Sequence, residues 1–253
     1  MSFYELGKEQ RNTLVEKINR EIADNLRSET VSGIIPFFAD EDTYIRKTTY
    51  LAIGRIYLTN AKLQERIITT LETLLKNDDA KTRQTSINAA GEIGKNDFVV
   101  VKHFFDTGLF DKHHSVRNAV IGSVKKMGEK NPQPVIEWAR TYLHHADREI
   151  RREICHGIEL RGRTHPEDIL PLLKELQHDK TKRVRDTLVH VIGQISYKKG
   201  CLEKVMNEIT KWDNKALVND AVMEIIDVHD RYRNFSFYTQ DEAKKCIEAT
   251  RSA

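Results

Sequence analysis

The sequence predicts an all-α fold, a solenoid of about six stacked helical hairpins with a capping helix at each end. Three observations support this prediction. An arginine returns at nearly constant spacing along the chain. Apolar residues recur every three or four positions, as they do on one face of a helix. The 253 residues include 12 Gly and 5 Pro, which is few for residues that interrupt regular helix.

The composition separates this chain from several other classes of protein. Charged residues make up 31% and apolar residues 39%, a balance that a two-layer helical stack produces. Cys155, Cys201 and Cys246 lie far apart, so we expect no disulfides. No apolar run approaches the roughly 20 residues that span a bilayer, and the first residues lack the pattern of a signal peptide. We therefore expect a cytoplasmic protein that does not contact membranes.

The clearest pattern is an arginine that follows each short polar loop, and we call these five residues the anchor arginines. Successive members stand 37, 34, 34 and 34 residues apart: Arg46, Arg83, Arg117, Arg151 and Arg185. The sixth position of the series is Asn219. Six residues before each position stands a side chain that mostly favours turns or helix N-termini: Asp40, Asn77, Asp111, His145, Asp179 and Asp213.

The two ends of the chain predict capping helices. Residues 1–29 form the N-terminal cap, in which residues 4–26 predict one amphipathic helix. Residues 231–253 form the C-terminal cap, where Thr239 and Glu242 make a capping box ahead of the last helix.

Residues 30–230 predict about six hairpins within a single domain that covers 1–253. In each hairpin a second helix begins with an apolar residue and the anchor arginine. Glycines such as Gly91, Gly122 and Gly193 lie inside these second helices, where glycine costs about 1 kcal/mol relative to alanine. Their recurrence predicts the close approach of a neighbouring helix.

Taken together, the loop aspartate, the apolar residue, the arginine and the later glycine resemble the HEAT-repeat family in its short form of about 34 residues. Asp179, Val184, Arg185 and Gly193 show the pattern in one unit. The resemblance covers roughly residues 30–230 and implies a right-handed α-α superhelix of armadillo-like type. Tetratricopeptide repeats share the period, but their pattern of tryptophan, leucine-glycine and tyrosine is missing here.

The anchor arginines have two interpretations. In the first, they bond loop aspartates in their own or the next unit and form a structural ladder, a common feature of the family that the chain resembles. Its members are Arg46, Arg83, Arg117, Arg151 and Arg185 with Asp40, Asp111 and Asp179. In the second, they form a basic track for a polyanion. We favour the ladder, because half-buried charge needs a partner.

The basic excess of the chain lies in the fourth and fifth units. Residues 138–199 hold 13 Lys or Arg and 9 Asp or Glu, an excess of four, while the whole chain carries +3. The candidates for contact with nucleic acid or a protein partner are Arg148, Arg152, Arg161, Arg163, Lys182, Arg183, His190 and Lys198. The alternative is a solvated face whose basic residues pair with acidic residues of the same helix.

The same stretch resembles a narrower family, the bacterial alkylpurine DNA glycosylases of DNA alkylation repair, which are built on HEAT-like repeats. The runs that carry the likeness are 148–153, 156–160 and 171–176. The resemblance implies a concave face that holds the backbone of duplex DNA, and an acidic residue that assists loss of a damaged base with nearby tryptophans. The family's tryptophan followed four residues later by aspartate is absent, because Trp138 is followed there by Tyr142 and Trp212 by Ala216. We assign no catalytic residue.

We also predict no metal site and no cofactor. The histidine pairs, such as His144-His145, are adjacent in sequence, so on a helix their rings diverge by about 100°. The leading interpretation is a non-catalytic HEAT-repeat binding or scaffold protein, with a partly basic surface for a protein or nucleic-acid partner. The alternatives are a DNA-binding glycosylase of the alkylation-repair type and a scaffold that binds only proteins.

Overall fold

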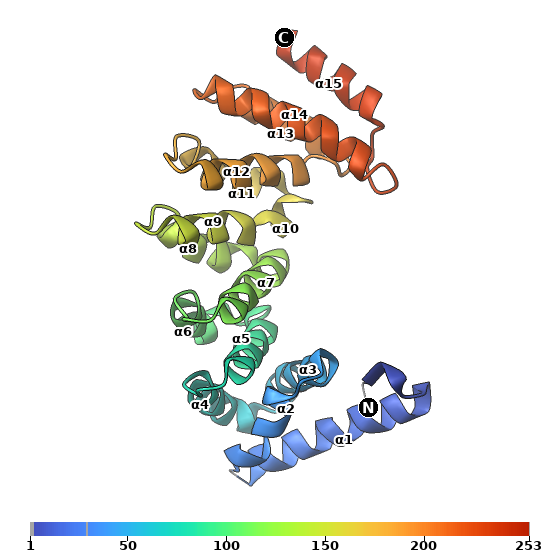
Figure 1. The fold of residues 1–253 in the computed structure, drawn as a ribbon, viewed down its shortest axis with the longest axis vertical. Helices are drawn as coiled ribbons and strands as arrows, with labels where there is room; N and C mark the ends of the chain where they lie inside the picture. Colours follow the sequence, from blue (N-terminus) through green and yellow to red (C-terminus); the bar gives the residue numbers. More distant parts are fainter. Residues whose placement is uncertain (1–2, 29, 253) are drawn as a thin grey trace. The chain divides into compact units, whose positions relative to one another are not determined.

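The computed structural model describes residues 3–28 and 30–252 of the chain. Across these residues the backbone forms α-helices and short 3-10 turns joined by loops, and no strand occurs among them. The all-α prediction is confirmed. The chain divides into two compact units, Met1–Asn131 and Pro132–Ala253, and each holds three helical hairpins and one terminal helix (Figure 1). A single continuous domain stays a prediction.

The first unit contains a capping helix and the first three hairpins. Its helices are α1 (Lys8–Arg27), α2 (Ile35–Ala39), α3 (Thr43–Thr59), α4 (Gln64–Leu75), α5 (Ala80–Gly94), α6 (Phe98–Gly108) and α7 (His114–Lys130). The second helices of the hairpins are α3, α5 and α7. Helix α5 packs between the other two and also contacts all three first helices, so it forms the centre of this unit's core.

The second unit contains the last three hairpins and a capping helix. Its helices are α8 (Pro132–Tyr142), α9 (Arg148–Gly157), α10 (Glu159–Gly162), α11 (Pro166–Glu175), α12 (Lys182–Gln194), α13 (Cys201–Ile209), α14 (Lys215–Arg231) and α15 (Gln240–Ser252). Here α12 packs between α9 and α14. The second helix of the first of these hairpins is interrupted at Ile158, which separates α9 from α10.

The N-terminal helix is shorter than the sequence predicts. A 3-10 turn over Phe3–Glu5 precedes it, and Gly7 has an extended backbone at the N-cap of α1. Glycine is unfavourable inside a helix, so the helix begins after Gly7 rather than at Tyr4. The buried side chains of α1 are Ile18, Ile22 and Leu26.

The sequence predicts that the glycines of the second helices allow close approach of a neighbouring helix, and this holds for some of them but not for all. A Cβ atom on Gly91 would lie 2.4 Å from the Oγ of Ser123 on α7, and one on Gly193 would lie 2.6 Å from the Cγ of Glu224 on α14. At these positions a neighbouring helix does approach closely, as predicted. A Cβ atom on Gly122 would meet nothing within 4 Å. The predicted reason is therefore wrong for Gly122.

The C-terminal cap forms as the sequence predicts. The backbone N–H of Thr239 donates to Glu242 Oε2 at 2.8 Å, and the backbone N–H of Glu242 donates to Thr239 Oγ1 at 3.3 Å. This reciprocal pair is a capping box at the start of α15. Before it, the ring of Tyr232 stacks on Tyr197 with the ring centres 5.4 Å apart.

The cysteines of the described residues are free thiols, two buried and one half-buried. Burial raises the pKa of Cys155, which lies in the core of the second unit, so this thiol stays protonated near neutral pH. Within the described residues, no helix combines the length and the apolar character that crossing a bilayer requires.

Candidate partner-binding surface

Each anchor arginine closes the loop of its own hairpin. Its Nη1 donates to the backbone carbonyl six residues earlier, which explains the fixed spacing between the two positions. Arg46 bonds the carbonyl of Asp40 in this way. The other distances are 2.9 Å for Arg83 to Asn77, 2.6 Å for Arg117 to Asp111, 2.7 Å for Arg151 to His145 and 2.6 Å for Arg185 to Asp179. A loop carbonyl near the end of a first helix thereby gains the donor that the helix does not supply.

Two anchor arginines also bond a carboxylate of the next hairpin. In the first unit, Arg83 donates Nε to Asp111 Oδ2 at 2.7 Å and Nη2 to Asp111 Oδ1 at 3.0 Å. In the second unit, Arg151 donates to the two oxygens of Asp179 at 2.6 and 3.2 Å. Each pair lies 28 residues apart and is bidentate, the stronger form of such a contact. We call these two pairs the rungs.

The rungs shift the pKa values of their aspartates. Burial raises the pKa of Asp111, but hydrogen bonds from Arg83 and from the backbone N–H of His113 outweigh it and hold this pKa below its ordinary value. Asp179 has the same balance, with Arg151 and the backbone N–H of Thr181 as its donors. Both carboxyls are therefore charged at neutral pH.

A second set of loop residues caps the N-termini of the second helices, and the spacing of the anchor arginines does not predict it. Four residues before an anchor arginine, a side chain caps the second helix by accepting a backbone N–H: Asp42 from Tyr44, Asp79 from Thr82, His113 from Ser115 and Asp147 from Glu149. An Asp at this fixed offset is the sequence signal that would have revealed these caps.

A shallow groove lies between two consecutive second helices in each unit. In the first unit it separates α3 from α5 and has a volume of about 350 Å³. In the second unit it separates α12 from α14 and has a volume of about 340 Å³. On the earlier helix, α3 or α12, both grooves begin three residues before the anchor arginine and continue four residues beyond it, to Tyr50 and Val189. On the facing helix the register differs: Gln84 to Asn88 follow Arg83, whereas most of the residues from Asn214 to Asp220 precede Asn219. We call them the first and second grooves.

The first groove is lined by aromatic, amide and basic side chains. Tyr44, Lys47 and Tyr50 come from α3, and Gln84 and Asn88 come from α5. The phenol of Tyr50 is half-buried, and burial raises its pKa, so it stays a neutral hydroxyl. Tyrosine with amide groups offers flat contact area together with hydrogen-bond donors and acceptors.

The second groove is lined mainly by charges of both signs. Lys182 pairs with Asp186 at 2.7 Å on α12, and Asp220 on α14 adds a further acidic group. Val189 and Leu217 supply the apolar part of its lining.

Most of the basic residues predicted to contact a partner already contact carboxylates. Glu149 on α9 receives Arg152 at 2.9 Å and also Arg183 from α12 at 3.2 Å. Arg161 on α10 pairs with Asp168 at 2.7 Å, and Asp168 lies on α11, the first helix of the next hairpin.

Three more of the predicted residues lie in specific contacts of the second unit. Arg163 bonds Glu159, and His190 Nδ1 lies 3.5 Å from Glu224 Oε1. The Nζ of Lys198 lies 4.8 Å from the ring centre of Tyr197. The side chain of Arg148 is exposed. The predicted residues therefore take part in several separate local contacts, most of them with carboxylates.

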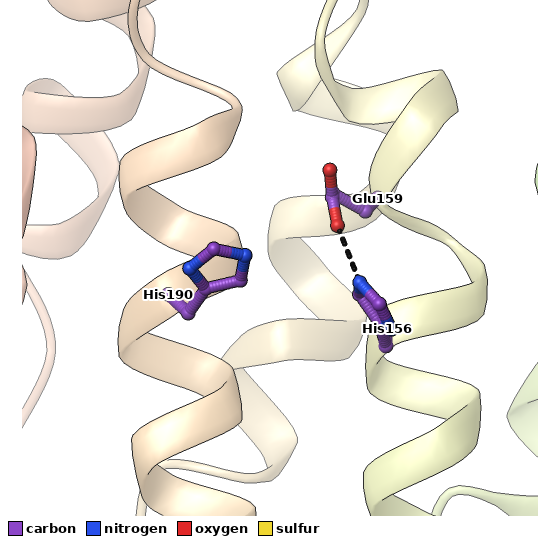
Figure 2. A group of neighbouring side chains, drawn as sticks. All are labelled: His156, Glu159 and His190. Carbon is purple, nitrogen blue, oxygen red and sulfur yellow. Dashed lines mark ion pairs between the residues drawn. The ribbon is translucent and has the colours of Figure 1, made fainter. Parts of the chain in front are cut away.

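One cluster that sequence spacing did not reveal lies on α9, α10 and α12. His156, Glu159 and His190 each offer one ligand atom, and these atoms all lie within 4.8 Å of one another. Figure 2 shows His156 and Glu159 joined by an ion pair and His190 facing them from the neighbouring helix. The two histidines are 34 residues apart, one repeat, and only the stacking of successive second helices brings them together.

The tryptophans named in the comparison with DNA glycosylases lie in the core. Trp138 is 2% exposed and Trp212 is fully buried. Neither indole is placed to stack on a nucleic-acid base from the surface of its unit.

No protein-family model matches this chain, and no curated protein matches it. Among solved structures, crescerin, which uses a TOG domain array to regulate microtubules in the primary cilium, is similar with a TM-score of 0.51 and 16% identity; the match covers 76% of this chain and 88% of that chain. This fold is a HEAT- and armadillo-like helical repeat. At such low identity the HEAT-like similarity establishes the fold alone.

Two larger HEAT-like structures are similar over a longer part of this chain. Importin beta matches with a TM-score of 0.48 and 12% identity over 89% of this chain and 34% of that chain. A chain of the Pds5–Scc1 complex matches with a TM-score of 0.48 and 13% identity over 96% of this chain and 37% of that chain. This chain thus spans about a third of their length.

Proposed function

We propose that this HEAT-like chain is a non-catalytic binding protein that docks a protein partner along its second helices. The observation that carries the proposal is a groove between second helices in each unit, which spans the same positions around the anchor arginine on α3 and on α12. Each groove combines charged or amide groups with aromatic or apolar side chains. An extended segment of polypeptide fits such a lining, because it offers its own backbone donors and acceptors and its side chains.

The pairing of the basic side chains favours a protein partner over nucleic acid. Binding to nucleic acid draws its free energy from phosphate contacts by unneutralised Lys and Arg. Here Arg152 and Arg183 share Glu149, and Lys182 pairs with Asp186. A surface of alternating sign instead matches a protein surface of complementary pattern.

A peptide-display selection on the full chain tests this proposal. Peptides selected on the wild-type chain are expected to bind the double variant Lys47→Glu, Gln84→Ala more weakly by about tenfold or more, because both residues line the first groove. Lys102→Glu is the control, because Lys102 is exposed on the first helix α6. Equal loss for both variants would contradict the groove as the binding surface.

A titration with labelled duplex DNA at two salt concentrations examines the nucleic-acid alternative. We expect weak binding at low salt. Tight binding that falls steeply with salt would overturn the protein-partner proposal in favour of a polyanion. Release of methylated purine from alkylated DNA by the same preparation would instead support the glycosylase alternative.

A further inference from the structure

We propose that His156, Glu159 and His190 bind one divalent transition-metal ion of the zinc type between α9–α10 and α12. The first argument is distance. His156 Nε2 lies 3.1 Å from Glu159 Oε2. Two ligands of a tetrahedral zinc ion lie roughly 3.3 Å apart, given metal–ligand distances of about 2.0 Å. The third ligand atom, from His190, lies within 4.8 Å of both. A small rotation of the His190 side chain would bring this atom to the spacing that a shared ion requires.

The second argument is the chemistry of the three ligands. Two imidazoles and one carboxylate are a ligand set that suits zinc and its first-row neighbours rather than Ca²⁺ or Mg²⁺. The carboxylate is 2% exposed, whereas the side chains of His156 and His190 are 37% and 42% exposed. The ion therefore has a path from solvent, and the fourth coordination position stays open to water.

The third argument is that residues around the cluster orient its ligands. Glu224 on α14 lies 3.5 Å from His190 Nδ1, and Figure 2 shows the other ring nitrogen of His190 turned toward His156 and Glu159. A carboxylate on the remote ring nitrogen is the usual way in which proteins fix a metal-binding histidine. Arg163 Nε donates to Glu159 Oε1 at 2.9 Å, so Oε2 is the oxygen turned toward His156.

Charge sets the expected strength of this site. The Arg163 guanidinium opposes a second cation beside Glu159. The carboxylate of Glu224 favours a cation, but Arg231 pairs with the same Glu224 oxygen and offsets part of this effect. With three protein ligands and an adjacent arginine, we expect weaker binding than at a closed four-ligand structural zinc site. Because the ligands come from two hairpins, the ion would stabilise the second unit by linking them.

Calorimetric titration of the full chain with ZnCl₂, purified without a histidine tag and freed of metal by chelator, tests the proposal. We expect one bound ion per chain. His156→Ala and His190→Ala each remove a ligand and should weaken binding at least about 100-fold. Glu224→Gln should weaken it about 10- to 100-fold, the range typical of residues that orient a ligand.

The matched control is His144→Ala. His144 is an exposed histidine that pairs with Glu175 at 2.8 Å, and it lies outside the proposed ligand set. This variant should bind Zn²⁺ as the wild-type chain does. Equal binding by His190→Ala and the wild-type chain, or no binding by the wild-type chain, would overturn the proposal.

A measurement on the wild-type chain avoids any dependence on how the variants fold. X-ray absorption at the zinc edge is expected to show two imidazole nitrogens with oxygen ligands. Sulfur ligation, or oxygen ligands alone, would show that the ion sits elsewhere and would overturn the assignment.

Discussion

In the first unit the second helices run without interruption. In the second unit, the second helix of the first hairpin is interrupted at Ile158, between α9 and α10. The loops of the two units are nevertheless built alike, and the described residues of each unit include a bidentate rung, Arg83–Asp111 or Arg151–Asp179. The break matters because Glu159 follows it directly and reaches His156 from there. The comparison teaches that the loops maintain the repeat, while the middle of the second helix is free to carry different chemistry.

Removing a rung is expected to have the largest effect on stability, and it tests whether the loops hold both units together in the same way. Arg83→Ala leaves the carboxylate of Asp111 half-desolvated without its partner, and Arg151→Ala does the same to Asp179. We expect each to lower the free energy of unfolding by about 3 kcal/mol, measured by urea denaturation.

The controls for this test are Arg46→Ala and Arg185→Ala. These arginines donate to loop carbonyls of their own hairpins, so the expected loss is about 1 kcal/mol. Equal losses across all four variants would mean that the rungs add nothing to loop closure.

The glycines give a smaller test within one pair of helices. Gly91→Ala places a Cβ atom 2.7 Å from the Cβ of Ser123, which cannot rotate away, so we expect a loss of about 1–3 kcal/mol. Gly122→Ala meets open space and should stabilise α7 by up to about 1 kcal/mol. Thermal melting of both variants measures the difference. A destabilised Gly122→Ala would show a close contact that the packing of α7 does not contain.

Acid should weaken both units through their rungs. The pKa values of Asp111 and Asp179 are lowered in the folded chain, so their stabilisation is complete above the unfolded value of about 3.9. It is lost as the pH falls through the folded pKa values. Between about pH 5 and pH 3 we expect the wild-type chain to lose on the order of 1–2 kcal/mol.

Urea denaturation at several pH values measures this loss. Asp111→Asn should be less stable than the wild-type chain at neutral pH and less sensitive to acid, because it has no charge to lose at that rung. An unchanged acid dependence in this variant would contradict the role of the Arg83–Asp111 rung.

Much of the fold could be predicted from the sequence, because each repeat is marked by the spacing of its apolar residues, its loop residues and its arginine. Six hairpins and the capping box at Thr239 follow from short-range patterns. The start of α1 is harder to predict, because residues 7–13 contain no large apolar residue whose spacing could mark the first turns of the helix. The open space at Gly122 depends on a neighbour that periodicity does not specify.

The candidate sites were less predictable, for a related reason. Charge counts found the basic residues of 138–199 but not the carboxylates that bond them, such as Glu149 for both Arg152 and Arg183. The grooves and the cluster at His156 and His190 arise between helices one repeat apart. Such contacts depend on how successive second helices stack, which the sequence of either helix alone does not determine.

The smallest expected effect concerns charge pairing in the second unit. Glu149→Gln removes the carboxylate that Arg152 and Arg183 share. If such pairing suppresses polyanion binding, this variant should bind labelled duplex DNA about threefold more tightly at low salt, with a steeper salt dependence. Glu65→Gln is the control, because Glu65 is exposed on α4 of the first unit and the change in net charge is the same. An equal rise in DNA affinity for both variants would assign the effect to net charge rather than to the loss of the carboxylate shared by Arg152 and Arg183. The two units would then not differ in how charge pairing affects DNA binding.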